Sequence, residues 1–205
     1  MIEDVEQERD VVLGNLVRAV HILESSDHFR FLMPEVRVNI VYSLENASSP
    51  NDVAGVDGRI TLVGGRVKAA GYPKLGASDH MARLLIEVRK YDRRYRAGIN
   101  FAWNPKISKF LEEYSREKNW DYGGIDRTME PEEMKVEEGK SMPWKVSVLA
   151  KMFGGKIPKL FYEGPGLGKE PLSILLGRNA VEVALEVCEI SRQYVVRGLE
   201  GSSKG

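Results

Sequence analysis

The chain has a single cysteine, no net charge and no long apolar run. Because Cys188 stands alone among the 205 residues, an intrachain disulfide framework and a cysteine-based zinc site are both excluded. The 30 basic residues equal the 30 acidic ones, which argues against a general nucleic-acid binder with its usual basic excess. No apolar run could cross a bilayer, and the acidic N-terminus is unlike a targeting peptide. These absences predict a cytoplasmic protein with no membrane or nucleic-acid partner.

What is present is the composition of a globular domain. Hydrophobic residues make up 42% of the chain, and a chain of this length buries roughly 70% of its unfolded surface without help from metals or disulfides. We expect one domain over residues 1–198 and a flexible C-terminal tail over 199–205, which ends in GSSKG. The 29% of charged residues, of mixed sign, would also suit a heat-adapted protein.

Helical and extended patterns alternate along the chain. Apolar residues recur every three or four positions, which predicts amphipathic helices, in 4–25, 78–91, 104–114, 141–153 and 179–190. Alternation or short apolar runs predict strands over 36–44, 59–63, 97–103, 120–126, 160–162 and 172–176. Segments 47–57 and 67–77 are interpreted as loops. The pattern favours an α/β layered domain with a central mixed sheet flanked by helices, antiparallel where 160–162 and 172–176 follow each other without a helix.

A glycine-rich loop leads into the predicted second helix at residues 71–80, GYPKLGASDH. Free N–H groups at a helix N-terminus suit a phosphate, and small residues let a ligand approach the backbone. Lys74 or His80 could add charge, whereas Asp79 would sit badly beside a phosphate unless a cation intervened. The other two histidines, on or just past the first helix, lack the spacing of metal ligands. An ordinary strand-to-helix connection capped by Asp79 is the alternative.

A second glycine-rich loop, GPGLGKE at 164–170, resembles a nucleotide-binding P-loop only superficially. The first glycine of that motif would fall at Glu163, and the residue that should hold magnesium is Glu170, so no ATPase is predicted. Gly168 and Lys169 could still hold an anion. A mobile surface loop is an equal alternative.

Polar residues also lie on or beside the predicted strands. Arg37 and Asn39 project from one face of the first strand, and Arg59 opens the next. Charged groups on a covered sheet are costly unless they are paired or face a ligand. Asp126, at a strand end, could coordinate Mg²⁺ or could begin a turn. These residues predict a domain that binds a phosphate or a diphosphate.

An ordered set of motifs is more specific than this periodicity. The motifs are PEVRVN (34–39), GRITLVGG (58–65), AAGYPKLGASDHMAR (69–83), SMPW (141–144) and GPGLGKEP (164–171). Together they resemble the ThiN-type thiamine-phosphate synthase domain over about residues 8–195. That domain mostly forms the C-terminal half of a protein whose N-terminal half is a hydroxymethylpyrimidine (phosphate) kinase, so the resemblance allows either a fragment of a bifunctional enzyme or a free-standing synthase.

The resemblance implies a transferase of thiamine biosynthesis. It would join hydroxymethylpyrimidine diphosphate to a thiazole phosphate and release pyrophosphate. No protein nucleophile is needed, because positioning of the two substrates and stabilisation of the departing charge suffice, and Mg²⁺ is the expected cofactor. The alternative is a domain that binds thiamine phosphate without turnover, as a sensor, although the helix-turn-helix of the family's transcriptional regulators is missing here.

The resemblance also assigns roles to residues at matching motif positions. It implies catalytic roles for Arg59, at the diphosphate, and for His80, at the leaving group or reacting centre. Asp126 is the candidate Mg²⁺ ligand. A kinase domain in the full-length chain and a homo-oligomer are the partners that it allows. Contacts to phosphate or substrate are implied for Arg37, Asn39, Gly76, Ser78, Asp79, Gly168 and Lys169.

Overall fold

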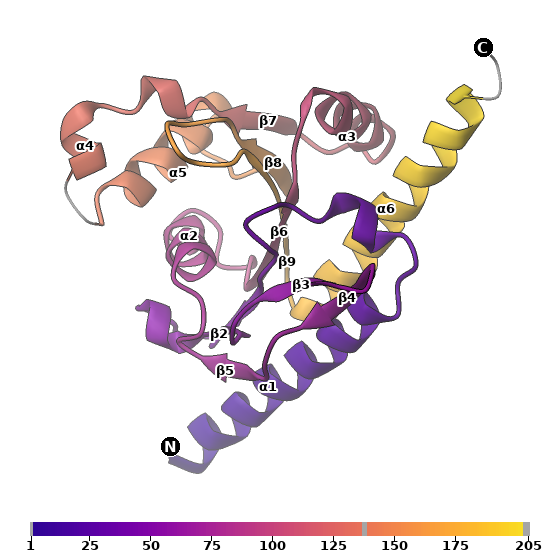
Figure 1. The fold of residues 1–205 in the computed structure, drawn as a ribbon. Helices are drawn as coiled ribbons and strands as arrows, with labels where there is room; N and C mark the ends of the chain where they lie inside the picture. The colour runs from indigo at the N-terminus through magenta and orange to yellow at the C-terminus, as the bar shows by residue number, and fades with distance from the viewer. Residues whose placement is uncertain (1, 137–138, 203–205) are drawn as a thin grey trace.

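The computed structural model describes the backbone of residues 2–136 and 139–202, which form one layered α/β unit around a seven-stranded sheet (Figure 1). The strand order is β5-β2-β1-β6-β9-β8-β7. Among the described residues β7 and β8 form the one parallel pair, and β8 and β9 are antiparallel, so the predicted mixed sheet is confirmed. The strands are β1 (Ile40–Ser43), β2 (Val53–Val56), β5 (Pro73–Leu75), β6 (Ala97–Ala102), β7 (Tyr122–Ile125), β8 (Leu160–Glu163) and β9 (Leu172–Gly177).

Helices cover both faces of this sheet and divide the core in two. Helices α1 (Ile2–Glu24), α3 (Pro105–Glu117) and α6 (Ala180–Ser202) share one hydrophobic cluster with the sheet. Helices α2 (His80–Arg89) and α5 (Ser141–Met152) share the other, on the opposite face, as Figure 1 shows. A short helix, α4 (Glu132–Val136), precedes α5.

The helix boundaries follow from capping residues that the sequence displays. The Asn104 side chain accepts a hydrogen bond from the Ile107 N–H at 2.8 Å, and Pro105 opens α3. At α6, Asn179 accepts from the Glu182 N–H at 2.9 Å. Helix α6 continues to Ser202, four residues into the segment predicted as a flexible tail, and residues 203–205 lie outside the described residues.

The first strand is shorter than its alternating pattern predicts. The prediction of a strand over 36–44 is wrong at its start, because Arg37 has a φ of 71° and the ladder begins only at Ile40. A left-handed residue turns the chain out of the extended conformation that pairing needs. Arg37 is therefore exposed in a turn and does not project from a strand face.

Both segments interpreted as loops contain strands. In 47–57 the missed strand is β2, whose four residues are all buried, so it has no polar alternation to reveal it. In 67–77 the sequence forms β5 and, with Arg66, β4 (Arg66–Ala69), which pairs with β3 (Ile60–Val63) as a two-stranded hairpin. Its turn is Gly64–Gly65, both with positive φ, as a mirror-image hairpin turn requires.

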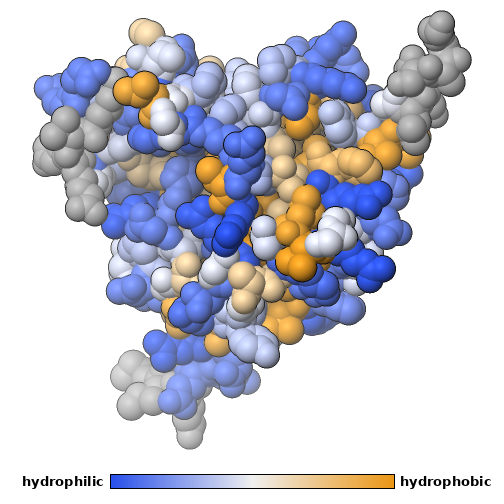
Figure 2. Space-filling view, viewed as in Figure 1, coloured by the Kyte–Doolittle hydropathy of each residue, from blue (hydrophilic) through white to orange (hydrophobic). Residues whose placement is uncertain are grey.

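Hydrophobic residues gather near the centre of the face drawn in Figure 2, over the β3–β4 hairpin, while most of that face is hydrophilic. Leu62 and Val63 of β3 are partly exposed there. No helix of the described residues is long and apolar enough to cross a membrane.

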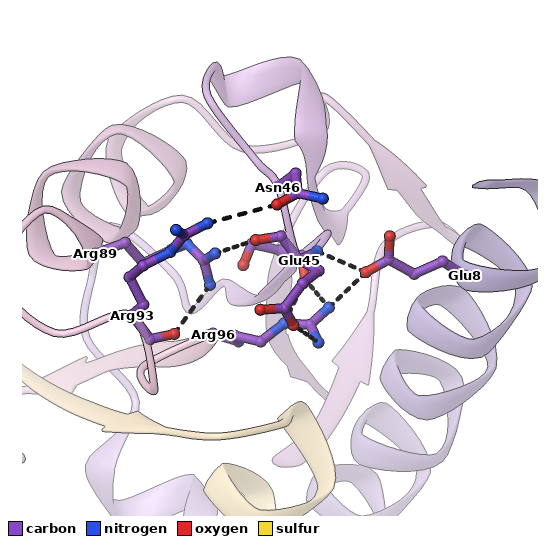
Figure 3. A network of polar contacts seen from close by, with 7 residues as sticks. Glu8, Glu45, Asn46, Arg89, Arg93 and Arg96 are labelled. Atoms are coloured by element: carbon purple, nitrogen blue, oxygen red, sulfur yellow. Dashed lines mark hydrogen bonds and ion pairs between the residues drawn. The ribbon is translucent and has the colours of Figure 1, made fainter. Parts of the chain in front are cut away.

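A network of charged residues, here called the Arg96 network, joins α1 to the sheet where the central strand β1 ends and β6 begins (Figure 3). It consists of Glu8, Glu45, Arg89 and Arg96. The Arg96 guanidinium contacts the Glu8 carboxylate at 2.8 Å and the Glu45 carboxylate at 2.6 Å. The Arg96 network thus links α1, the segment after β1 and the segment before β6.

Candidate active site

A cavity of about 300 Å³ lies where several chain segments distant in sequence meet. They come from the turns before β1 and β3, the start of α2, strand β6, the segment after β7, helix α5 and the loop between β8 and β9. Six of the residues predicted from the sequence line it: Asn39, Arg59, Ser78, His80, Gly168 and Lys169. The other lining residues are Val36, Met81, Asn100, Arg127, Lys145, Glu170 and Leu172.

Arg59 reaches this cavity from a strained turn. Its φ is 69°, directly after Gly58 at 68°, and a left-handed conformation costs a non-glycine residue on the order of 1–2 kcal/mol. Backbone hydrogen bonds fix the turn, from the Arg59 N–H to the Val56 carbonyl at 3.1 Å and from the Ala70 N–H to the Arg59 carbonyl at 2.9 Å. The guanidinium then donates to the Val36 carbonyl at 2.7 Å. Strain held in this way is typical of functional positions.

Two buried asparagines shape the wall beside Arg59. The Asn39 amide donates to the Val56 carbonyl at 3.1 Å and accepts from the Val56 N–H at 2.9 Å, as a neighbouring strand would. Asn100 accepts from the Asn39 N–H at 2.8 Å and donates to the Arg37 carbonyl at 3.0 Å. Asn39 therefore lines the cavity while its amide binds the backbone at the end of β2. It stabilises the neighbouring turns that carry Arg37 and Arg59.

The start of α2 brings Ser78 and His80 to the cavity but turns Asp79 away from it. The Asp79 side chain makes no capping hydrogen bond and pairs instead with Arg83 at 2.7 Å, so the alternative of a connection capped by this side chain is wrong. Lys74 pairs with Asp57 at 2.9 Å, away from the lining.

Gly76 and Arg37 also lie outside the lining residues. Gly76 has a φ of 72° and donates its N–H to the Val53 carbonyl at 3.0 Å, so it shapes the approach to α2. The Arg37 guanidinium is exposed and contacts only the Gly58 carbonyl, at the long distance of 3.5 Å, among the described residues. The structure therefore gives neither residue a place at the cavity.

The back wall of the cavity is a group of charged side chains, here called the Glu163 cluster. Glu163, His80, Arg127 and Lys145 form it. Oxygen Oε1 of Glu163 forms a hydrogen bond of 3.0 Å with His80 Nε2. Oxygen Oε2 accepts hydrogen bonds from Arg127 Nε at 2.9 Å, from Arg127 Nη2, and from Lys145 Nζ at 3.2 Å. The Glu163 side chain is fully buried, and the side chains of Arg127 and Lys145 are each 4% exposed.

The three partners of Glu163 decide its ionisation. Burial by itself raises the pKa of this carboxyl, but the hydrogen bond from His80 and the charges of His80, Lys145 and Arg127 outweigh it. They hold the Glu163 pKa well below its usual range, so the group is an ionised carboxylate at neutral pH.

Positive charge exceeds negative charge in this wall. Glu163 faces two permanent cations and a histidine, and Arg59 and Lys169 add to them across the cavity. The one carboxylate among the lining residues, Glu170, accepts from the backbone N–H groups of Glu35 and Val36 at 2.9 and 2.8 Å. Burying unbalanced charge is costly, and an anionic ligand would offset that cost.

Sequence reasoning missed five of the polar lining or wall residues, namely Asn100, Arg127, Lys145, Glu163 and Glu170. Three of them had a local signal, because Glu170 lies within the motif GPGLGKEP, Lys145 directly follows the SMPW motif and Glu163 directly precedes the second glycine loop. A carboxylate at the end of an apolar strand, as Glu163 is, is itself unusual and marks a candidate site.

Asp126, the candidate Mg²⁺ ligand, serves as a helix cap. It is exposed, outside the lining residues, and its Oδ1 accepts from the Thr128 N–H at 2.9 Å and from Thr128 Oγ1 at 2.6 Å. These hydrogen bonds lower the Asp126 pKa. Among the described residues no three histidine, cysteine or acidic side chains are grouped to hold a metal ion.

Comparison with known proteins now decides the family. A family model for thiamine-phosphate synthase ThiN matches residues 15–189. The chain belongs to the ThiN family. It is 35% identical to the thiamine-phosphate synthase ThiN of Methanothermobacter thermautotrophicus over 192 residues, which are 94% of this chain and 97% of that protein.

Two other ThiN relatives place the domain in a wider context. The chain is 31% identical to the bifunctional thiamine biosynthesis protein ThiDN of Methanocaldococcus jannaschii, covering 91% of this chain but only 42% of that protein. The crystal structure of a C-terminal domain of phosphomethylpyrimidine kinase has the same fold, with a TM-score of 0.82 at 36% identity, over 88% of this chain and 98% of that one.

Proposed function

We propose that this ThiN domain is a thiamine-phosphate synthase that works in the cavity walled by the Glu163 cluster. The observation that carries the proposal is the excess of positive charge among the residues of a cavity lined by family motif residues, in a chain similar to a ThiN synthase over nearly its whole length. Such a wall suits a substrate that carries a diphosphate and a second that carries a phosphate.

The reaction needs charge stabilisation more than it needs a reactive side chain. The bond between the pyrimidine methylene carbon and the diphosphate oxygen breaks, and its electron pair leaves with the diphosphate. The lone pair of the thiazole nitrogen then forms the new carbon–nitrogen bond, which gives thiamine phosphate and pyrophosphate. Fixed cations that face the leaving oxygen stabilise the charge developing on it without having to reorganise.

The lining residues suggest how these tasks are divided. Arg59, Arg127, Lys145 and Lys169 supply charge and N–H donors for phosphate groups, and the loop at Gly168 offers its backbone. His80 reaches the same space from the start of α2 and can exchange a hydrogen bond with the leaving group. Ser78, buried beside it, is a further candidate contact.

Mg²⁺ stays a prediction, and the residues fit it poorly as a protein-bound ion. Both carboxylates at the cavity are engaged, Glu163 by cations and Glu170 by backbone N–H groups, and Asp126 lies elsewhere. An ion carried in by the diphosphate itself is the arrangement that these residues allow. None of the steps above depends on it.

A turnover assay with both substrates and Mg²⁺ tests the proposal. The wild-type protein should release pyrophosphate, and Arg59→Ala and His80→Ala should each reduce that release by about 100-fold or more while leaving the fold intact. Matched controls are Arg94→Ala, an exposed arginine paired with Asp92, and His21→Ala, an exposed histidine near the end of α1. Tight binding of thiamine phosphate without pyrophosphate release would instead establish the sensor function.

The remaining expectations concern context. The ThiDN relative, of which the chain matches less than half, and the solved C-terminal domain of a phosphomethylpyrimidine kinase support a kinase domain joined to this one in a longer protein. The ThiN relative, matched over 97% of its length, supports a free-standing synthase. A cytoplasmic location, heat adaptation and a homo-oligomer stay predictions.

A further inference from the structure

The two oxygens of the Glu163 carboxylate have separate partners. Oε2 takes the N–H groups of Arg127 and the Lys145 ammonium, and Oε1 takes His80 Nε2. Arg127 also donates from Nη1 to the Glu170 carbonyl at 3.0 Å, so its guanidinium is fixed at both ends. With two cations on one oxygen, the carboxylate cannot turn without breaking three hydrogen bonds, and Oε1 is held toward the imidazole.

An ionised carboxylate can only accept hydrogen bonds, and this restricts the imidazole. The partners of Glu163 hold its pKa well below the usual range, so Oε1 carries no proton to donate. The hydrogen bond at 3.0 Å therefore requires the proton on His80 Nε2. In a histidine, the partner of one ring nitrogen determines the state of the other.

We propose that Glu163 is a positioning residue, which holds His80 with the proton on Nε2 so that Nδ1 is the nitrogen presented to the substrates. The proposal rests on the function proposed above, because it assigns the ring atom that meets the leaving group. His80 is 37% exposed and lines the cavity, whereas its Nε2 edge is committed to a fully buried oxygen.

The consequence for the reaction is that the ring meets its ligand in one fixed orientation. An unprotonated Nδ1 and a diphosphate oxygen are both acceptors, so the ring holds the diphosphate as an imidazolium, which donates from Nε2 to Glu163 and from Nδ1 to the ligand. Arg127 and Lys145 then have two tasks, since they fix the carboxylate and also contribute the positive charge of the wall. A group preorganised in this way pays no orientation cost during the reaction.

Nitrogen NMR of the untagged protein, labelled with ¹⁵N in histidine, tests the proposal directly. The sequence has only three histidines, and the His80 signals are identified by their loss in His80→Asn. We expect Nε2 to keep its proton at every pH at which the protein is folded, so that any titration of this ring appears at Nδ1. A neutral ring with its proton on Nδ1, or an even mixture, would overturn the proposal without any variant of Glu163.

Glu163→Gln sharpens the test because it should reverse the assignment. The amide oxygen would turn to Arg127 and Lys145, and the amide NH₂ would then face His80 Nε2, which must accept. An amide NH₂ cannot accept from an imidazolium, so we expect the ring to be held neutral with its proton on Nδ1. Without the charged ring at the leaving group, kcat should fall on the order of 100-fold or more. KM should change by far less than kcat.

Glu8→Gln is the matched control, since it removes a carboxylate charge from the Arg96 network without touching the cavity. It should leave both kcat and the His80 signals unchanged. If Glu163→Gln lowers only the amount of folded protein, with kcat per folded molecule and the tautomer unchanged, Glu163 is structural and the proposal is wrong. A wild-type protein that releases no pyrophosphate would contradict the proposed function, while the NMR result would still decide the tautomer.

Discussion

The Glu163 cluster and the Arg96 network both place arginines against carboxylates, yet their charges are arranged differently. In the Arg96 network, Arg96 contacts two carboxylates, from Glu8 and Glu45, and also donates to the Ser43 carbonyl at 2.9 Å (Figure 3). In the Glu163 cluster one carboxylate pairs with an arginine, a lysine and a histidine. The first network is close to balanced, and the second has a surplus of positive charge.

The difference extends to what each group faces. In the Arg96 network the remaining donors go to backbone, since Arg89 donates to the carbonyls of Glu45 and Arg93, and none of its members lines the cavity. Burial, followed by repulsion from Arg96, lowers the Arg89 pKa. All but the carboxylate of the Glu163 cluster line the cavity. In the Arg96 network, balanced charges with hydrogen bonds to backbone carbonyls join helices to the sheet. In the Glu163 cluster, the surplus of positive charge at the cavity wall suits an anionic ligand.

The largest expected effect comes from breaking the Glu163 cluster at its arginine. Arg127→Met leaves the buried carboxylate with weaker compensation, and the free energy of unfolding should fall by about 3 kcal/mol or more. Glu8→Gln, at a side chain that is 29% exposed, should cost less than about 1 kcal/mol. Urea denaturation at neutral pH measures both. Equal losses would show that the two networks do not differ in the way described.

The second prediction removes the lysine of the Glu163 cluster and keeps the arginine. Lys145→Met leaves Glu163 paired with Arg127 and His80, so the free energy of unfolding should fall by less than in Arg127→Met, while affinity for pyrophosphate should fall roughly tenfold to 100-fold through loss of a charged hydrogen bond. Calorimetric titration with pyrophosphate measures the affinity. Lys159→Met, which removes a partly buried lysine outside the cavity, is the control and should bind normally. Unchanged affinity in Lys145→Met would remove this lysine from the ligand site.

The smallest effect is a pH dependence specific to the Glu163 cluster. The pKa of Glu163 in the folded protein lies below its unfolded value of 4.5. The ionised carboxylate therefore contributes fully to the free energy of unfolding at pH values well above 4.5, and this contribution is lost on acidification. The loss amounts to about 1.4 kcal/mol at about pH 3.5. Glu163→Gln lacks this contribution. The difference in free energy of unfolding between wild type and variant should therefore be about 1.4 kcal/mol smaller at about pH 3.5 than at neutral pH. Parallel stability curves for the two proteins would contradict the depressed pKa.

Local sequence signals were sufficient wherever neighbours along the chain decide the outcome. The side chains of Val12, Leu16 and Leu23, which recur at the helical spacing within 4–25, are fully buried on α1, and Asn104 and Asn179 cap their helices. Such signals fail where burial on both faces removes the alternation, as in β2, or where one left-handed residue interrupts it, as at Arg37. The same helical spacing includes Val17, which is 53% exposed because it falls at the edge of the buried face.

In the candidate site, too, the motifs predicted some of the residues at the cavity and were wrong about others. Arg59, His80, Gly168 and Lys169 belong to motifs whose order the chain displays, and the structure places all four at one cavity. Asp79 belongs to the same motif, but its pairing with Arg83 four residues on turns it outward. Motif membership therefore identifies the segment that reaches the cavity without identifying which of its side chains point there.

The sequence by itself determined the family, the layered α/β class and the segments that converge on a basic cavity, because each of these depends on local patterns and on motif order. Only the tertiary structure brought Arg127, Lys145 and His80 onto the carboxylate of Glu163. These four residues are separated by up to 83 positions, and no local pattern encodes which cations will share a buried carboxylate. The neutral net charge of the chain hid this surplus, since charge acts through distance in space and not through its sum over the sequence.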